Sequence, residues 1–349
     1  MPVSIKRTAR IDMRGVDDQL DESSVAAISS GVPTLSMQKA SALPAQAPVR
    51  LPMPVMIGVG VLLLISLGLT IPFDPTWWQV VILGVVQGLT EFLPISSTAH
   101  LLIVGNLIGF TGTIGGTFDI AIQIGTVIAV IAFNIADLFG QAKSLIDRSN
   151  PAATAAAQRL WIAVAVAFLP AALIGLAFRK IIKQVLFESP TLIAAALIVG
   201  GIIFLVIELL PRRAARTTNL GEISIGQALG VGVAQVFALV PGTSRSGSSI
   251  VGGLLSGLDR RTATAFSFYL SIPVLGAATL VDLLGSLSQI QPSDWGRLLL
   301  GTVVSMIVGW LSIGWLLRYV ARNSFISFGI YRIIAGVVIL ALVFIGWLS

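Results

Sequence analysis

One short apolar stretch of the chain carries a carboxylate, an imidazole and three hydroxyl groups. Glu91 and His100 flank Pro94, Ser96, Ser97 and Thr98, and His100 is the single histidine of the 349 residues. Gln87 lies four positions before Glu91, so the two side chains share one face of a helix. Because ionisable groups are costly to bury among apolar residues, Glu91, His100, Ser97 and Gln87 are candidate catalytic residues.

A second segment combines glycines, hydroxyls and one arginine ahead of an apolar helical stretch. It comprises Pro241, Gly242, Thr243, Ser244, Arg245, Ser246 and Gly247. Small residues before a helix start let backbone N–H groups converge on an anion, and the planar fork of Arg245 suits phosphate oxygens. We expect a phosphate-binding site built from Arg245, Ser244, Thr243, Ser246 and Gly242, with Ser96 and Thr98 contributing from the first segment.

Together the two segments meet the needs of phosphoryl transfer, which are charge stabilisation and a positioned nucleophile. Glu91 serves as a base or a metal ligand, and either Ser97 or an activated water attacks. Glycoside hydrolysis would more plausibly use two carboxylates, and these segments hold only Glu91. A zinc site would need more His or Cys, and the chain has no Cys.

The composition indicates that these segments lie in a membrane. Hydrophobic residues make up 55% of the chain and charged residues 11%, whereas a soluble domain carries about 25% charged residues. The solvent for most of the chain is therefore lipid. The net charge of +6 is interpreted as loop orientation rather than nucleic-acid binding, so membrane lipids and no nucleic acid are the expected partners.

The hydropathy pattern divides the chain into three regions. Residues 1–50 mix acids, bases and small residues without an apolar period, which predicts a disordered tail. An uncharged apolar stretch at 51–73 is long enough for a transmembrane helix, and the domains are therefore 1–50, 51–74 and 75–349. Further spans are predicted at 117–137, 160–178, 189–210, 264–285, 297–317 and 325–348.

Two apolar regions, 78–110 and 223–258, are broken near the middle by proline and small polar residues. Non-helical backbone at membrane depth survives only inside protein or beside a wet cavity, so both regions are predicted to be re-entrant hairpins. They belong to a repeat, because Gln87 and Gln235 are 148 positions apart, as are Phe118 and Phe266.

Each half of the repeat, about 78–211 and 223–348, has one hairpin and three spans, and an odd number of spans inverts the second half. The expected fold is therefore an all-α polytopic membrane protein with an inverted repeat and an extra N-terminal transmembrane segment. Such repeats also build secondary transporters, so a lipid or small-molecule transporter or flippase is the alternative function. A lipid-binding scaffold without catalysis is a third.

Basic residues predict the orientation. With a cytoplasmic tail, ten Lys and Arg residues fall in cytoplasmic loops or span ends and four on the other side, as the positive-inside rule requires. The first hairpin then opens to the outer face and the second enters from the cytoplasm.

Residues 84–100, GVVQGLTEFLPISSTAH, resemble the first signature of the bacterial undecaprenyl-diphosphate phosphatase family, which is linked to bacitracin resistance. Residues 241–247 resemble its second signature, and FDIAIQIG (118–125) and FGIYRI (328–333) are similar to further family segments. The resemblance covers roughly 75–349. Gln87 stands where some members have Glu, and Ala99 replaces a common Gly.

The resemblance implies hydrolysis of undecaprenyl diphosphate at the outer face of the bacterial inner membrane, which recycles the lipid carrier for peptidoglycan and other envelope polymers. The implied substrate is a polyprenyl diphosphate. By motif position, Gln87 and Glu91 match the acidic or amide pair, Ser97 the hydroxyl, His100 the histidine, and Ser244 and Arg245 the phosphate-binding pair. A divalent cation, Mg²⁺ or Ca²⁺, is the implied cofactor, with Glu91 and Gln87 as its ligands.

Overall fold

The computed structural model describes residues 53–348, apart from 73, 111–116, 183–185, 187–188, 211–214, 287 and 289. The predicted disordered tail, 1–50, lies outside the described residues. Every regular element in the described part is a helix, and the one β contact is an isolated bridge between Thr217 and Leu258. The prediction of an all-α protein is confirmed.

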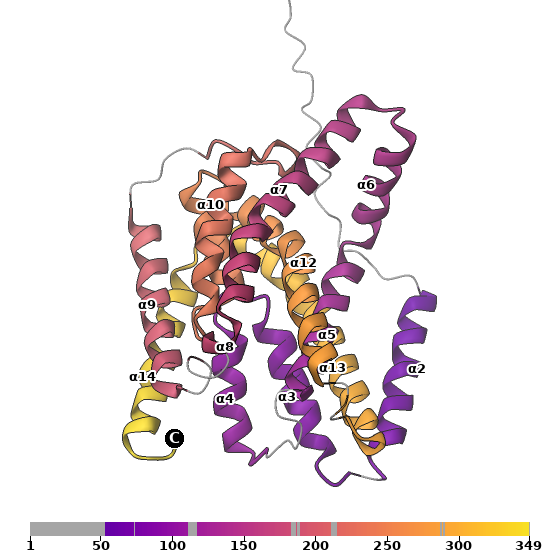
Figure 1. Cartoon of the computed structure of the whole chain (residues 1–349), viewed down its shortest axis with the longest axis vertical. Coiled ribbons are helices and arrows are strands. Elements are labelled where there is room, and N and C mark those ends of the chain that lie inside the picture. The colour runs from indigo at the N-terminus through magenta and orange to yellow at the C-terminus, as the bar shows by residue number, and fades with distance from the viewer. Residues whose placement is uncertain are drawn as a thin grey trace, which may run out of the picture. The chain divides into compact units, whose positions relative to one another are not determined.

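Thirteen α-helices follow one another along the described chain, with short 3-10 turns between some of them (Figure 1). The first six are α2 (Met53–Thr70), α3 (Trp77–Thr90), α4 (Ser97–Leu107), α5 (Thr117–Phe133), α6 (Ile135–Asp147) and α7 (Pro151–Ala177). The short α8 (Arg179–Ile181) and α9 (Pro190–Leu209) come next. The last five are α10 (Ile225–Val236), α11 (Arg245–Leu255), α12 (Arg260–Ser286), α13 (Trp295–Val320) and α14 (Ile326–Phe344). The 3-10 turns are η2 (Leu220–Glu222), η3 (Phe237–Leu239) and η5 (Pro292–Asp294).

Five of the described helices are long and apolar enough to cross a membrane: α7, α9, α12, α13 and α14. The bent pair of α5 and α6 makes a sixth candidate if the two helices form one span. The helix in the predicted N-terminal span, α2, is one of the shorter apolar helices. These helices make the chain a multi-pass membrane protein.

The span predicted at about 117–137 is bent in the structure. The chain bends by 64° between α5 and α6, and α5 ends at Phe133. At the bend, the Asn134 side chain donates to the Val130 carbonyl over 2.8 Å, and side-chain bonds of this kind compete with the helix ladder. The α6 segment then turns polar, with Asp137 in its first turn.

Small residues let α5 and α13 approach one another closely. A Cβ on Gly125 of α5 would collide with the Ser305 side chain and the Thr302 carbonyl of α13. Ser305 Oγ donates to the Ile122 carbonyl over 2.7 Å, and Thr302 Oγ1 donates to the Ala121 carbonyl over 2.9 Å. Small residues and cross-helix hydroxyl bonds are the usual means of helix association in lipid, where burial of apolar surface gives little gain.

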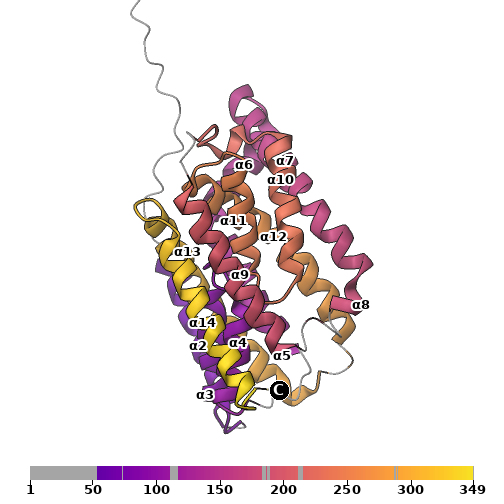
Figure 2. The same cartoon turned by 90° about the vertical axis from the view of Figure 1, so that its left-hand side faces the viewer.

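The two broken regions, 78–110 and 223–258, are pairs of helices that come from opposite ends of this bundle. In Figures 1 and 2, α3 and α4 lie in the lower half and α10 in the upper half. Each pair is joined by a short loop at its inner end, so the loops lie near the middle of the bundle. The elements thus bring two sequence segments 148 positions apart into one neighbourhood.

Candidate active site

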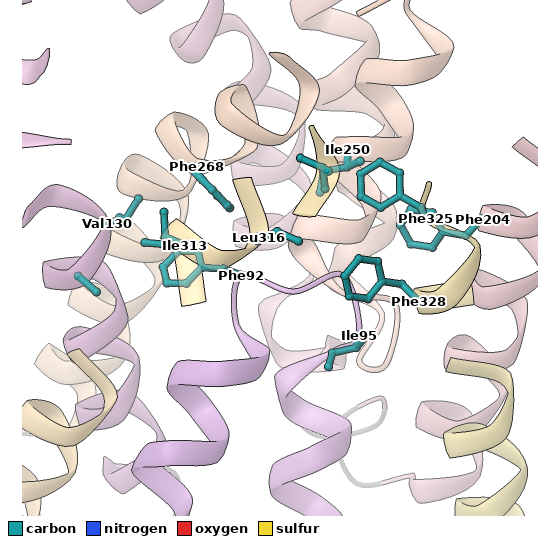
Figure 3. Packing of buried hydrophobic residues seen from close by; sticks show 12 residues of the cluster. Phe92, Ile95, Val130, Phe204, Ile250, Phe268, Ile313, Leu316, Phe325 and Phe328 are labelled. Carbon is teal, nitrogen blue, oxygen red and sulfur yellow. The ribbon is translucent and has the colours of Figure 1, made fainter. Parts of the chain in front are cut away.

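The first loop, residues 91–96, joins α3 to α4. Pro94 has no N–H with which to continue the helix, and the Ile95 amide closes a tight turn onto the Leu93 carbonyl at 2.8 Å. Phe92 and Ile95 anchor the loop in the central apolar cluster, where Figure 3 shows them beside aromatic residues of other helices. These anchors fix the backbone that carries the candidate base.

The second loop, residues 237–244, joins α10 to α11. Gly242 has a φ of +91°, and a Cβ at this position would collide with the Ile193 carbonyl, so only glycine fits. Ser244 caps α11, because its Oγ accepts from the Gly247 amide at 3.1 Å. Its φ of +73° matches the +71° of Ser96 in the first loop, and each serine precedes a helix of 11 residues.

Glu91 lies at the centre of the candidate site. Its Oε2 accepts from Ser97 Oγ at 2.8 Å and from Gln87 Nε2 at 3.2 Å. The Glu91 side chain is 7% exposed, so little water competes for these bonds. A hydroxyl thus donates to a buried carboxylate, and Gln87 orients that carboxylate. This is the arrangement of a nucleophile and its base.

Arg245 approaches the other oxygen of the same carboxylate. Its Nε and Nη2 each lie 3.5 Å from Glu91 Oε1, and both side chains of this ion pair are largely buried. Its Nη1 donates to the Ser267 carbonyl at 3.0 Å, and Ser249 Oγ lies 2.7 Å from Ser267 Oγ. The guanidinium is therefore held beside the nucleophile's base, where phosphate oxygens would also be bound.

Two side chains link the loops to each other. Ser246 Oγ, in the first turn of α11, donates to the Leu93 carbonyl at 3.0 Å. Arg332 of α14 donates from Nη1 to the Pro94 carbonyl at 3.0 Å, and from Nη2 to the carbonyls of Gly242 and Thr243 at 3.1 and 2.9 Å. The relative position of the loops thus depends on side-chain donors that bind backbone acceptors.

Arg332 is a buried residue of the candidate site that the sequence reasoning did not single out. It is fully buried, and its Nε and Nη2 also donate to the carbonyls of Leu197 and Ala196 in α9 at 3.3 Å. A Cβ on Gly200 would occupy the space of this guanidinium. The available signal was an arginine inside an otherwise apolar span, which by itself marks a functional position.

His100 lies in the first turns of α4, and its hydrogen-bond partners differ from those of Glu91. Its Nδ1 lies 2.8 Å from the Ser96 carbonyl, and its Nε2 lies 2.6 Å from the Tyr331 hydroxyl. The imidazole and the Tyr331 ring are stacked, with 8° between their planes. Ser97, which precedes His100 by three positions, donates to Glu91 instead.

The other predicted phosphate-binding residues occupy three kinds of position. Ser96, Ser244 and Ser246 are buried at the two helix starts, and Ser244 Oγ lies 3.1 Å from Ser246 Oγ. Gly242 and Thr243 turn their carbonyls to Arg332, so their backbone supports the loop. Thr98 is half-buried in the first turn of α4.

The donors available for a divalent cation are few. No group of three His, Asp or Glu residues suited to a metal occurs within the described residues. Glu91 and Gln87 supply one carboxylate and one amide oxygen. That set fits Mg²⁺, which keeps several waters and shares substrate phosphates, better than Ca²⁺, which takes six to eight oxygen ligands.

Sequence comparisons identify similar proteins over most of the chain. The sequence model of the family described as bacitracin resistance protein BacA matches residues 80–338. A protein of Deinococcus radiodurans named undecaprenyl-diphosphatase is 43% identical over 271 residues, which cover 76% of this chain and 95% of that protein. Proteins of the same name from Albidiferax ferrireducens and Neisseria gonorrhoeae are 44% and 42% identical, over 74% and 78% of this chain and 92% and 97% of their own lengths.

Proposed function

Because the chain belongs to the bacitracin resistance protein BacA family and hydrolyses undecaprenyl diphosphate, we propose that its two loops form the active site and that Ser97 is the nucleophile. The observation that carries this proposal is the 2.8 Å hydrogen bond from Ser97 Oγ to Glu91 Oε2. It places a proton acceptor on the hydroxyl before substrate binds, as nucleophilic catalysis requires.

In the first step, Ser97 Oγ attacks the terminal phosphorus and gives its proton to Glu91. The bond from that phosphorus to the bridging oxygen breaks, and undecaprenyl phosphate leaves. In the second step, a water attacks the phosphorus of the phosphoserine, and the bond from that phosphorus to Ser97 Oγ breaks. Glu91 returns the proton to Ser97 Oγ, and inorganic phosphate is released. His100, one turn along α4 from Ser97, accepts the proton of that water.

Charge on the phosphoryl oxygens is stabilised by Arg245 and by the N-terminus of α11. The Glu91–Arg245 ion pair supports this role, because a bound phosphate can replace Glu91 as the partner of the guanidinium. A divalent cation would be held by Glu91 and Gln87 and would supply positive charge next to the diphosphate. Gln87 also orients Glu91 directly.

Trapping of a phosphoenzyme tests the nucleophile. Purified protein mixed with a polyprenyl diphosphate labelled in its terminal phosphate should carry label on Ser97 after a rapid acid quench. Ser97→Ala should abolish both the label and phosphate release, while Ser149→Ala, on an exposed loop, should change neither. Multiple turnovers by Ser97→Ala at the wild-type rate would assign the attack to water.

We further propose that the two hairpins are re-entrant and belong to an inverted repeat, so that the site faces the periplasm across the inner membrane. The entry of α3 and α10 from opposite ends supports this arrangement (Figure 1). The chain has no Cys, so single cysteines can be added freely. Thr218→Cys should be labelled only from the cytoplasm and Gln291→Cys only from outside, and the opposite pattern would invert the assignment.

The opposed hairpins also suit a transporter or flippase. Vesicles containing the purified protein and a fluorescent polyprenyl phosphate would test this second activity. Movement of lipid between leaflets by the Ser97→Ala variant would establish transport independently of hydrolysis. A leaflet exchange rate equal to that of protein-free vesicles would exclude transport and leave hydrolysis as the only one of these two activities.

A further inference from the structure

Tyr331 has no part in the reaction steps described above. It lies one position before the buried Arg332. Its hydroxyl lies 2.6 Å from His100 Nε2, and its ring stacks on the imidazole at a centroid distance of 5.6 Å. The two residues are 231 positions apart and come from α14 and α4. Tyr331 is 44% exposed, so it covers His100 from the outside of the bundle.

The partners of the imidazole determine which nitrogen carries the proton. The Ser96 carbonyl can only accept a hydrogen bond, so His100 Nδ1, at 2.8 Å, must donate to it. In the neutral ring, Nε2 is then the acceptor, and the Tyr331 hydroxyl is the donor. The contacts on both sides of the ring therefore select one tautomer.

We propose that Tyr331 is the positioning residue of His100. It holds the ring plane by stacking and holds the lone pair of Nε2 in place by donating to it. This inference rests on the proposed function, in which His100 accepts a proton from the attacking water. A water that displaces the tyrosine hydroxyl meets an Nε2 that is already unprotonated and oriented, so no tautomer exchange is needed in the cycle.

The fold makes α14 suited to this role. Arg332 is fixed by five backbone carbonyls, so the backbone of the neighbouring Tyr331 cannot shift without disturbing both loops. The same helix thereby sets the positions of the loop backbones and of the imidazole. Positioning by rigid elements of this kind is what keeps an acid–base group in productive geometry.

The single histidine allows a direct spectroscopic test. Protein labelled with ¹⁵N-histidine and purified without a histidine tag should give one imidazole spectrum, with Nδ1 protonated and Nε2 unprotonated. Tyr331→Phe keeps the stacking but removes the donor, so the Nε2 resonance should shift while Nδ1 stays. Tyr319→Phe is the matched control, because it removes a hydroxyl that bonds Ser327 Oγ at 3.1 Å. An unmoved Nε2 resonance in Tyr331→Phe would overturn the inference.

Kinetics complete the test. One lost hydrogen bond contributes about 0.5–1.5 kcal/mol, so kcat of Tyr331→Phe should fall roughly 3- to 10-fold with KM unchanged, and Tyr319→Phe should match wild type. In a His100→Asn background, Tyr331→Phe should add no further loss. A further loss there would show that Tyr331 acts independently of His100. Wild-type turnover by His100→Asn alone would instead refute the proposed role of His100, separately from the Nε2 result.

Discussion

Replacement of Arg332 by Met tests whether this buried arginine holds the two loops together. Methionine has a similar length and suits an apolar span, but it donates no hydrogen bond. The carbonyls of Pro94, Gly242 and Thr243, now bound at 2.9–3.1 Å, would lose their donor. Water would have to enter the bundle to satisfy them, or the loops would have to move.

The hydrogen bonds set the expected size of the effect. Each buried acceptor left without a partner costs about 1–3 kcal/mol, so three loop carbonyls give a ceiling of roughly 3–9 kcal/mol. Part of this loss of stability is offset, because the variant no longer buries a guanidinium and so avoids its desolvation penalty. We therefore expect a net loss of about 3 kcal/mol, and a fall in turnover of roughly 10²-fold from displaced loops.

Two measurements on protein in detergent check this expectation: the thermal unfolding midpoint and phosphate release at a temperature where the variant is folded. Arg332→Lys should be intermediate, because a point donor cannot span the carbonyls of both loops. Arg318→Lys, at an exposed position of α13, is the control and should match wild type. If Arg332→Met kept the wild-type midpoint and turnover, the claim that Arg332 positions the loops would be wrong.

Three further predictions follow from the site and its supports. Arg245→Lys keeps the positive charge but loses the planar, forked guanidinium, so the rate of phosphate release should fall at least 10-fold. Size-exclusion chromatography should still show folded protein. Turnover near the wild-type rate would show that Arg245 is not part of the site. Gly242 has a φ of +91° and lies against the Ile193 carbonyl. Gly242→Ala should therefore lower the unfolding midpoint by the equivalent of about 1–3 kcal/mol. Gly226 has open space around it, so Gly226→Ala should not lower the midpoint. Hydrogen bonds from Thr76 and the ion pair with Arg297 hold the pKa of Asp74, in the loop before α3, below its usual 3.8 although burial opposes them. The stability that Asp74 contributes is therefore present above about pH 4 and is lost as the pH falls through the lowered pKa. The difference in unfolding midpoint between wild type and Asp74→Asn should therefore decrease toward zero in acid. A difference that does not change with pH would contradict this.

The sequence predicted the parts of the fold that depend on hydropathy and on proline. An apolar run broken at Pro94 or Pro241 could only be two short helices with a loop, and the structure has both. The span predicted at about 117–137 bends by 64° after Phe133 in the structure, where the Asn134 side chain donates to the Val130 carbonyl, and hydropathy does not indicate such a bond.

The chemistry of the site was accessible from residue types, whereas its internal supports were not. Glu91, Ser97 and Arg245 could be grouped because each is unusual within an apolar segment and the predicted repeat pairs those segments. The partners of Arg332 are backbone carbonyls, which every residue has, so no residue type indicates them. The contact of His100 with Tyr331 joins residues 231 positions apart, and a tyrosine at the surface of a span is ordinary in a membrane protein.

The hydrogen bonds of Arg332 have a consequence for the order of events at the membrane. All five run to neutral carbonyls within the described chain, so its charge adds to that of Arg245, while Glu91 offsets only one of the two. The loops therefore lie in a positive potential, which holds an anion more strongly the more charge it carries. A lipid diphosphate carries more negative charge than the lipid monophosphate it becomes, so cleavage itself weakens the electrostatic binding of the lipid and favours its release. An uncharged polyprenol is not attracted into the site by this potential.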